Sequence, residues 1–195
     1  KGNVKFDNLF GYVQPDKAYD FTHNQAYTLS LSDWEEKPKR THPSFIGGYY
    51  SYIYCEAKDG SNYSLISKKK YSGNIAVEFL IDTGAEMPVD LFIKVSKEVN
   101  LALKITDKTV KLFNNNEILV SNPIERDLPF RSTLFSYFYE IEGDELTFYM
   151  TDKKGTQLKV LNYNISKYIK DKEYLIGIGT SKVMGIKQIS IWDKK

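Results

Sequence analysis

The chain is poor in the residues that build disulfide frameworks and metal centres. Its 195 residues include one cysteine, Cys55, and two histidines, His23 and His42. A single cysteine excludes a disulfide framework and any metal site held by several thiolates. Cys55 follows Ile53 with strand spacing, so we interpret it as a small buried side chain. A catalytic thiol would need one of the two histidines as its base.

Long apolar runs and an excess of one charge are also missing. No stretch approaches the ~20 apolar residues that span a bilayer, and 27 Lys and Arg oppose 25 Asp and Glu, which leaves a net charge of +2. We therefore expect neither membrane insertion nor a nucleic-acid partner. The consecutive lysines at 68–70 fit a solvated turn better than a binding patch. The chain begins at a lysine, as a mature or trimmed chain does, so the lack of a leader says little about its compartment.

What the chain does have is alternation of apolar and polar residues, which recurs from Tyr49 to the C-terminus. It is clearest at residues 75–81, 99–105 and 135–141. Each such run predicts a strand with one buried face, because successive side chains on a strand point to opposite sides. Many strands joined by short turns predict an all-β fold, a two-sheet antiparallel β-sandwich. Residues 164–169, with Asn164 as a cap, are the one short helical candidate.

No fixed-period repeat, low-complexity tract or linker divides the chain, so we expect one sandwich domain over residues 1–195. Residues 1–46 are its irregular part, interrupted by Pro15, Pro38 and Pro43. This segment is nevertheless rich in aromatic residues, which disordered tails lack. We predict that it packs on the sandwich and adds a strand at residues 26–31.

Three strand patterns resemble those of the concanavalin A-like lectin/glucanase jelly roll, in its laminin-G-like branch. They lie at residues 73–79 (GNIAVEF), 110–118 (VKLFNNNEI) and 186–192 (IKQISIW), within a match over roughly 49–193. In particular, the chain is similar to bacterial glycoside hydrolases of the 3-keto-disaccharide hydrolase type. The resemblance implies a jelly roll, a role with carbohydrate, and a secreted, periplasmic or cell-surface location. Folds of this kind host lectins, hydrolases and adhesion domains, so the fold does not choose among these activities.

Two carboxylates are candidates for catalysis. Glu78 and Glu140 stand opposite the apolar faces of their strands, and with Lys94 and Phe138 they are expected on the concave sheet. Paired carboxylates there can serve as the acid and base of a glycoside hydrolase. The alternative is a solvent-facing sheet with salt bridges.

A second acidic segment lies at residues 140–145. The resemblance extends to laminarinase-type jelly-roll hydrolases, whose catalytic strand has a spacing that Glu140, Glu142 and Glu145 roughly reproduce. The intervening Gly143-Asp144 is typical of a hairpin turn, which would move Glu145 to the next strand. We therefore interpret this segment as a solvated hairpin.

Aromatic residues suggest a sugar platform, because the C–H face of a sugar packs on an aromatic ring. Tyr50, Tyr52 and Tyr54 share one face of a strand, where cross-strand packing is an equal alternative. Trp34, in a polar segment that contains proline, is expected to be an exposed platform in a loop near one end of the concave sheet.

Two further residues complete the candidate site. Arg131 and His42 are assigned to it without a position in space. Trp192 is expected to pack instead, because its strand alternates. No metal or other cofactor is predicted, and a structural calcium ion on scattered Asp and carbonyl oxygens stays open.

Three functions follow from these patterns. The first is a carbohydrate-binding jelly-roll domain of a secreted or surface protein of bacterial glycan use, with an oligo- or polysaccharide as its partner. The second is a glycoside hydrolase that uses Glu78 and Glu140. The third is a non-catalytic adhesion or assembly domain, whose exposed aromatic residues meet another protein.

Overall fold

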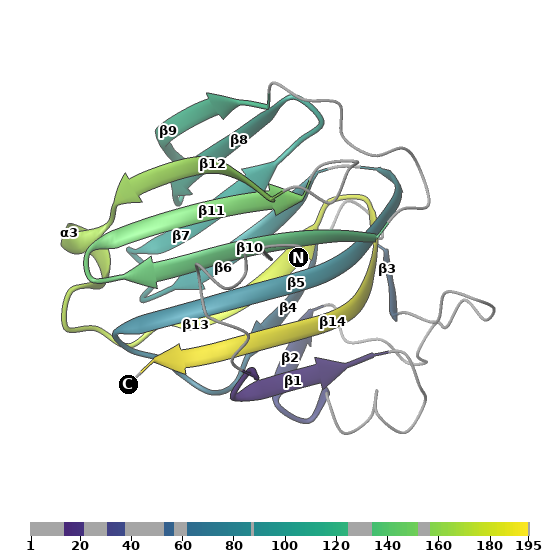
Figure 1. Ribbon diagram of the computed structural model, residues 1–195, viewed down its shortest axis with the longest axis horizontal. Coiled ribbons are helices and arrows are strands. Elements are labelled where there is room, and N and C mark those ends of the chain that lie inside the picture. Colours follow the sequence, from purple (N-terminus) through teal and green to yellow (C-terminus); the bar gives the residue numbers. More distant parts are fainter. Residues whose placement is uncertain are drawn as a thin grey trace, which may run out of the picture.

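The computed structural model describes residues 14–21, 31–37, 53–56, 62–86, 88–124, 134–151 and 157–194. Two antiparallel sheets of seven strands each pack face to face (Figure 1). This confirms the all-β sandwich that the alternation predicts. One short helix, α3 (Ser166–Ile169), lies where it is expected, and the side-chain oxygen of Asn164 accepts the backbone N–H of Ser166 at 3.2 Å.

The first sheet, sheet A, holds both ends of the described chain. Its order is β1 (Lys17–Asp20), β14 (Val183–Lys194), β5 (Asn74–Glu86), β10 (Leu134–Glu142), β11 (Glu145–Thr151) and β12 (Gln157–Asn164), with β3 (Ile53–Glu56) also paired to β14.

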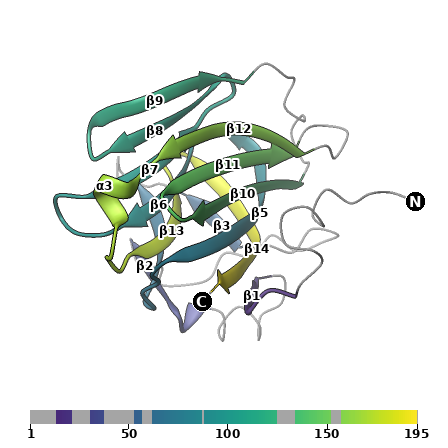
Figure 2. The same cartoon turned by 60° about the vertical axis from the view of Figure 1, so that its left-hand side comes forward.

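The second sheet, sheet B, has the order β2 (Trp34–Lys37), β4 (Tyr63–Ser67), β13 (Leu175–Thr180), β6 (Val89–Lys94), β7 (Asn100–Ile105), β8 (Thr109–Asn114) and β9 (Glu117–Pro123). Helix α3 connects β12 of sheet A to β13 of sheet B at one end of the sandwich (Figure 2).

The core lies between the sheets and consists of the apolar half of each alternating run. Strands β6 and β7 bury every second residue, and β5 buries Ile75, Val77, Phe79 and Ile81. Complete burial of one such side chain stabilises the fold by about 1.5–3 kcal/mol. The polar half of each run therefore lies on the two outer faces of the sandwich.

The clearest predicted hairpin is confirmed. Strands β10 and β11 pair from Tyr137–Met150 to Glu142–Glu145, and Gly143 turns the chain at a φ of 57°. A side chain would strain this left-handed conformation. Glu140 and Glu145 consequently lie on different strands, as the solvated-hairpin interpretation requires.

The described part of the N-terminal segment contributes one strand to each sheet. Strand β1 pairs with β14 and strand β2 pairs with β4. Of residues 26–31 the structure describes only Leu31, which is helical rather than extended, so the strand prediction is wrong there. In the described part of the chain, no helix is long and apolar enough to cross a membrane.

Trp34 is not the exposed loop residue that the sequence suggests. It opens β2, is only 3% exposed, and its ring packs edge-on against Tyr19 with the ring centroids 5.3 Å apart. The four-residue strand is too short for its alternation to be recognised, and the polar residues after Trp34 mask its burial. Trp34 is therefore a core residue rather than a binding platform.

We expect Trp34→Ala to lower the free energy of unfolding by about 3–5 kcal/mol, because removal of a buried indole leaves a cavity. Urea denaturation measures this loss. Glu35→Ala, at the exposed neighbouring position of the same strand, is the control and is expected to stay within about 0.5 kcal/mol. A Trp34→Ala loss below about 1 kcal/mol would contradict the assignment to the core.

Candidate functional site

Glu78 and Glu140 lie on the same outer face of sheet A. Glu78 on β5 is directly opposite Phe138 on β10, and Glu140 is two residues further along β10. The two carboxylates are therefore diagonal neighbours, as the paired-carboxylate hypothesis requires. The Ser136 hydroxyl donates a hydrogen bond to Glu78, and the Tyr149 hydroxyl donates one to Glu140 at 2.9 Å.

Three aromatic rings lie beside these carboxylates. The Phe138 ring is buried between Tyr149 and Trp192, with ring centroids 5.7 and 6.2 Å away. Trp192 packs against Phe138, but on the outer face of sheet A, because the alternation of β14 puts Ile189 and Ile191 in the core. Burial raises the pKa of Tyr149, and the hydrogen bond to Glu140 raises it further, so this phenol keeps its proton and donates to the carboxylate.

Lys94 does not belong to this group. It lies on β6 in sheet B, so its side chain is on the opposite outer face of the sandwich from Glu78 and Glu140. The expectation that Lys94 shares their face is wrong, because alternation shows which side of a strand is buried but not which sheet the strand joins.

Other predicted site residues fall where side chains are not described. Tyr54 lies in β3 opposite Gly185, and Cys55 lies opposite Met184, both described as backbone only. Tyr50, Tyr52, Arg131, His23 and His42 lie outside the described residues. Among the residues that the structure does describe, no group of three or more His, Cys, Asp and Glu side chains is placed to hold a metal ion.

The outer face of sheet B carries two parallel rows, a polar row that crosses all seven strands and an apolar row that crosses six of them. In the polar row each residue is directly opposite the next: Lys37, Ser64, Gly179, Asp90, Lys104, Lys111 and Ser121. The neighbouring apolar row runs through Ile66, Gly177, Phe92, Ala102, Phe113 and Ile118. These rows emerge only once the strand order is known.

Strand β13 contributes glycines, Gly177 and Gly179, to the two rows, so it places no side chain of its own there. A Cβ at Gly179 would lie 2.8 Å from the Phe92 ring, and one at Gly177 would lie 2.5 Å from the Ile66 side chain. Both distances are too short for real atoms. Ile66 and Phe92 thus occupy the space above β13, which fixes the Phe92 ring against the sheet.

Charged groups on either side of Phe92 are partly removed from water. Burial raises the pKa of the Asp90 carboxyl, and the nearby Lys104 offsets this only in part. Burial lowers the pKa of the Lys94 amine, with Lys37 acting in the same direction, and the Lys94 ammonium lies 5.0 Å from the centre of the Phe92 ring. Asp90 and Lys94 are thus partly desolvated charges on either side of an aromatic ring, which makes this face a candidate site.

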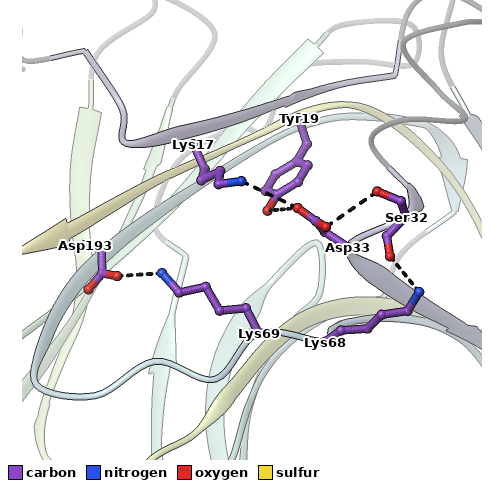
Figure 3. Close-up of polar contacts among 7 residues, drawn as sticks. All are labelled: Lys17, Tyr19, Ser32, Asp33, Lys68, Lys69 and Asp193. Carbon is purple, nitrogen blue, oxygen red and sulfur yellow. Dashed lines mark hydrogen bonds and ion pairs between the residues drawn. The ribbon is translucent and has the colours of Figure 1, made fainter.

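The loop of three lysines, residues 68–70, makes polar contacts with three other segments of the chain. Lys68 donates to the backbone oxygen of Ser32 at 2.6 Å, and Lys69 pairs with Asp193 at 2.8 Å (Figure 3). Lys70 pairs with Glu173 at 3.2 Å. The loop borders a hollow of about 610 Å³ with Asn74 and Asp193, but each ammonium group already has a partner from another segment.

Comparison with known proteins supports the fold alone. No protein-family model matches the chain, and no curated protein matches it in sequence. The metal-free carbohydrate recognition domain of Emp46p has a TM-score of 0.68 at 11% identity, over 94% of this chain and 100% of that one. A Bacillus subtilis protein of unknown function with a galectin-like fold has a TM-score of 0.66 at 8% identity, over 93% and 96%.

The seed lectin of Lotus tetragonolobus also matches, with a TM-score of 0.63 at 8% identity, over 92% of this chain and 99% of that one. The chain therefore has the concanavalin A-like jelly-roll fold that its strand patterns resemble.

Asp90 gives the stability of the protein a specific pH dependence. Its pKa is higher in the folded than in the unfolded state, so its contribution to stability is present below the unfolded pKa and is lost as the pH rises through the folded pKa. We expect Asp90→Asn to be more stable than the wild type at pH 7. This advantage should shrink as the pH falls towards about 4, where unfolded aspartate protonates.

Thermal unfolding between pH 4 and pH 8 measures the difference, with Asp107→Asn in the exposed turn after β7 as the matched control. An Asp90→Asn variant that is less stable than the wild type at pH 7 would show that the carboxylate is stabilised in place.

Proposed function

We propose that the chain is a carbohydrate-binding domain whose ligand lies across the outer face of sheet B. The observation that carries this proposal is the pair of rows, one polar and one apolar, that cross the sheet side by side. A sugar has the same two-sided character, because its C–H face packs on an aromatic ring while its hydroxyl groups bond to polar neighbours.

The geometry of the rows suits an extended oligo- or polysaccharide. Adjacent strands are about 4.8 Å apart, so contacts recur at that interval along a line perpendicular to the strands. Phe92 and Phe113 supply rings in the apolar row, and Ser64 and Asp90 supply hydrogen-bonding groups in the polar row. Because the lack of a side chain at Gly179 lets the Phe92 ring lie against β13, the ring is ordered before binding. Less side-chain entropy is then lost when a ligand binds.

The structural neighbours support the proposal without deciding it. The matching domain of Emp46p is a carbohydrate recognition domain, and the Lotus protein is a lectin. The biological setting we propose is a secreted, periplasmic or surface-attached protein of bacterial glycan use. Tyr54 belongs to β3 of sheet A and therefore not to this face, and Trp34 is a core residue, whereas Tyr50, Tyr52 and Arg131 stay predictions outside the described residues.

We expect Phe92→Ala and Phe113→Ala each to weaken glycan binding by about fivefold, which corresponds to the ~1 kcal/mol of one aromatic contact. Affinity electrophoresis with a broad panel of soluble polysaccharides selects the ligand and measures the change. Phe113→Ala is the decisive variant, because Phe92 also packs against Gly179 and its loss can affect folding.

Tyr149→Ala, an aromatic truncation on the outer face of sheet A, is the matched control. Loss of binding in this variant, with both phenylalanine variants unaffected, would move the site to sheet A. A folded wild-type protein that binds no member of the panel would refute the proposal.

A second candidate function is a glycoside hydrolase, including the 3-keto-disaccharide hydrolase type that the sequence resembles. The observation that favours it is the placement of Glu78 and Glu140 on one face as diagonal neighbours. Diagonal neighbours on antiparallel strands are about 7–8 Å apart. Inverting enzymes separate their two carboxyl groups by about 6.5–9.5 Å, which leaves room for a water molecule.

For this hydrolase, we expect Glu78→Gln and Glu140→Gln each to lower the rate of reducing-sugar release by about 10²-fold or more, the usual contribution of an acid or base. Glu142→Gln, in the exposed hairpin, is the control and is expected to keep full activity. Equal residual activity in all three variants would exclude the carboxylate pair as the catalytic groups.

A further inference from the structure

We propose that the glycan bound on sheet B is anionic, a chain of hexuronate residues whose carboxylates pair with lysines of the polar row. This inference rests on the proposed carbohydrate-binding function and adds the chemical class of the ligand. It follows from the arrangement of charge on the two outer faces.

Two lysines of the polar row face each other on neighbouring strands. Lys104 on β7 is directly opposite Lys111 on β8, and like charges in this position destabilise a sheet. Among the described residues, neither lysine has an ion-pair partner within 4.0 Å. Asp90 lies opposite Lys104 on its other side, whereas Lys111 has the uncharged Ser121 on its other side, so one carboxylate faces two ammonium groups. An anion from outside the chain would therefore neutralise the positive charge of Lys104 and Lys111.

The rest of this face adds to the positive charge. Lys94 lies beside Phe92 and has no recorded ion pair with another described residue. Lys37, at the far end of the row, pairs with Glu35 at 3.1 Å and is locally neutralised. The uncompensated lysines consequently gather on β6, β7 and β8, next to the rings of the apolar row.

The other outer face has the opposite character. The outer face of sheet A carries Glu78, Glu140, Glu142 and Glu145 on its central strands against Lys159 on β12, so acidic side chains predominate there and the near-neutral net charge conceals a separation between the two faces. An anionic polymer is repelled from sheet A and attracted to sheet B.

The two lysines lie close enough together to bind the same polyuronate. Strands β7 and β8 are neighbours (Figure 2), about 4.8 Å apart, and Lys104 is directly opposite Lys111. A polyuronate carries one carboxylate on every residue, so a carboxylate on the side of the polymer that faces the sheet can lie between the two ammonium groups. The apolar row explains why the ligand is a sugar rather than any polyanion, because Phe92 and Phe113 would pack on its ring faces.

The test compares polygalacturonate oligomers with their full methyl esters, which keep the sugar and remove the charge. Isothermal titration calorimetry measures binding to the wild type and to the Lys104→Gln, Lys111→Gln double variant. We expect the double variant to bind polygalacturonate roughly tenfold more weakly. We also expect wild-type binding to weaken with added salt, because salt screens exposed charges.

The matched control is a Lys159→Gln, Lys170→Gln double variant, which removes the same charge from β12 and from the residue after α3. Its affinity is expected to stay within about twofold of the wild type, because a general change in net charge is screened beyond roughly 10 Å. Thermal unfolding separates binding from folding, since Lys104→Gln relieves a repulsion and is expected to leave the melting temperature unchanged or raised.

Each alternative outcome has a distinct meaning. Equal binding of the methyl ester overturns the anionic inference and leaves the carbohydrate-binding function intact. Equal binding of polyglutamate shows attraction by charge alone and overturns it as well. Preference for dextran sulfate over polygalacturonate overturns the uronate assignment. Binding of none of the glycans, charged or neutral, refutes both this inference and the proposed function.

Discussion

Burial of one face of every strand between the two sheets is the constraint on which the rest of the structure depends. A shift of β6 by one residue would expose Val89, Leu91 and Ile93 and would bury Asp90 and Lys94 in their place. Each apolar side chain moved into water would cost about 1.5–3 kcal/mol, and each unpaired charge moved into the core would cost more. The core thus fixes the register of the strands, and the register fixes the two outer rows of sheet B. The packing of the core therefore also decides which side chains lie together on the outer face of sheet B.

Contacts between loops hold one end of the sandwich together, beside the packing of the core. Tyr71 and Tyr174 exchange backbone hydrogen bonds of 2.9 Å in each direction, and the Tyr174 hydroxyl donates to the Gly73 carbonyl at 2.8 Å. Burial, aided by the charge of Asp193, raises the pKa of Tyr71 to about 12, which keeps this hydroxyl neutral in the interior. The polar contacts of the loop of three lysines lie at the same end, so these lysines contribute to the fold.

Alternation predicts the fold well because it reports directly on burial. The β10–β11 hairpin, helix α3 and the inward residues of β5 all follow from local patterns. Alternation does not say which strands are neighbours, and that information places Lys94 on the opposite face from Glu78 and aligns Lys104 with Lys111. Trp34 fails for a different reason: its strand has four residues, and its burial depends on Tyr19, which is remote in sequence. Sequence patterns thus predict which side of a strand is buried, whereas the strand order decides which side chains become neighbours on the surface.

The separation of charge between the sheets makes the two proposed functions constrain each other. Glu78 and Glu140 lie on an outer face whose other acidic side chains repel polyanions, whereas Lys104 and Lys111 lie on a face that attracts them. A polyuronate held on sheet B is therefore a poor substrate for carboxylates on sheet A, because its own carboxylates would have to approach theirs. Hydrolysis at Glu78 and Glu140 would require a neutral or cationic sugar, and binding at the lysines an acidic one. One protein can combine both activities only on two different glycans, or on one glycan whose charged and neutral stretches reach opposite faces of the sandwich.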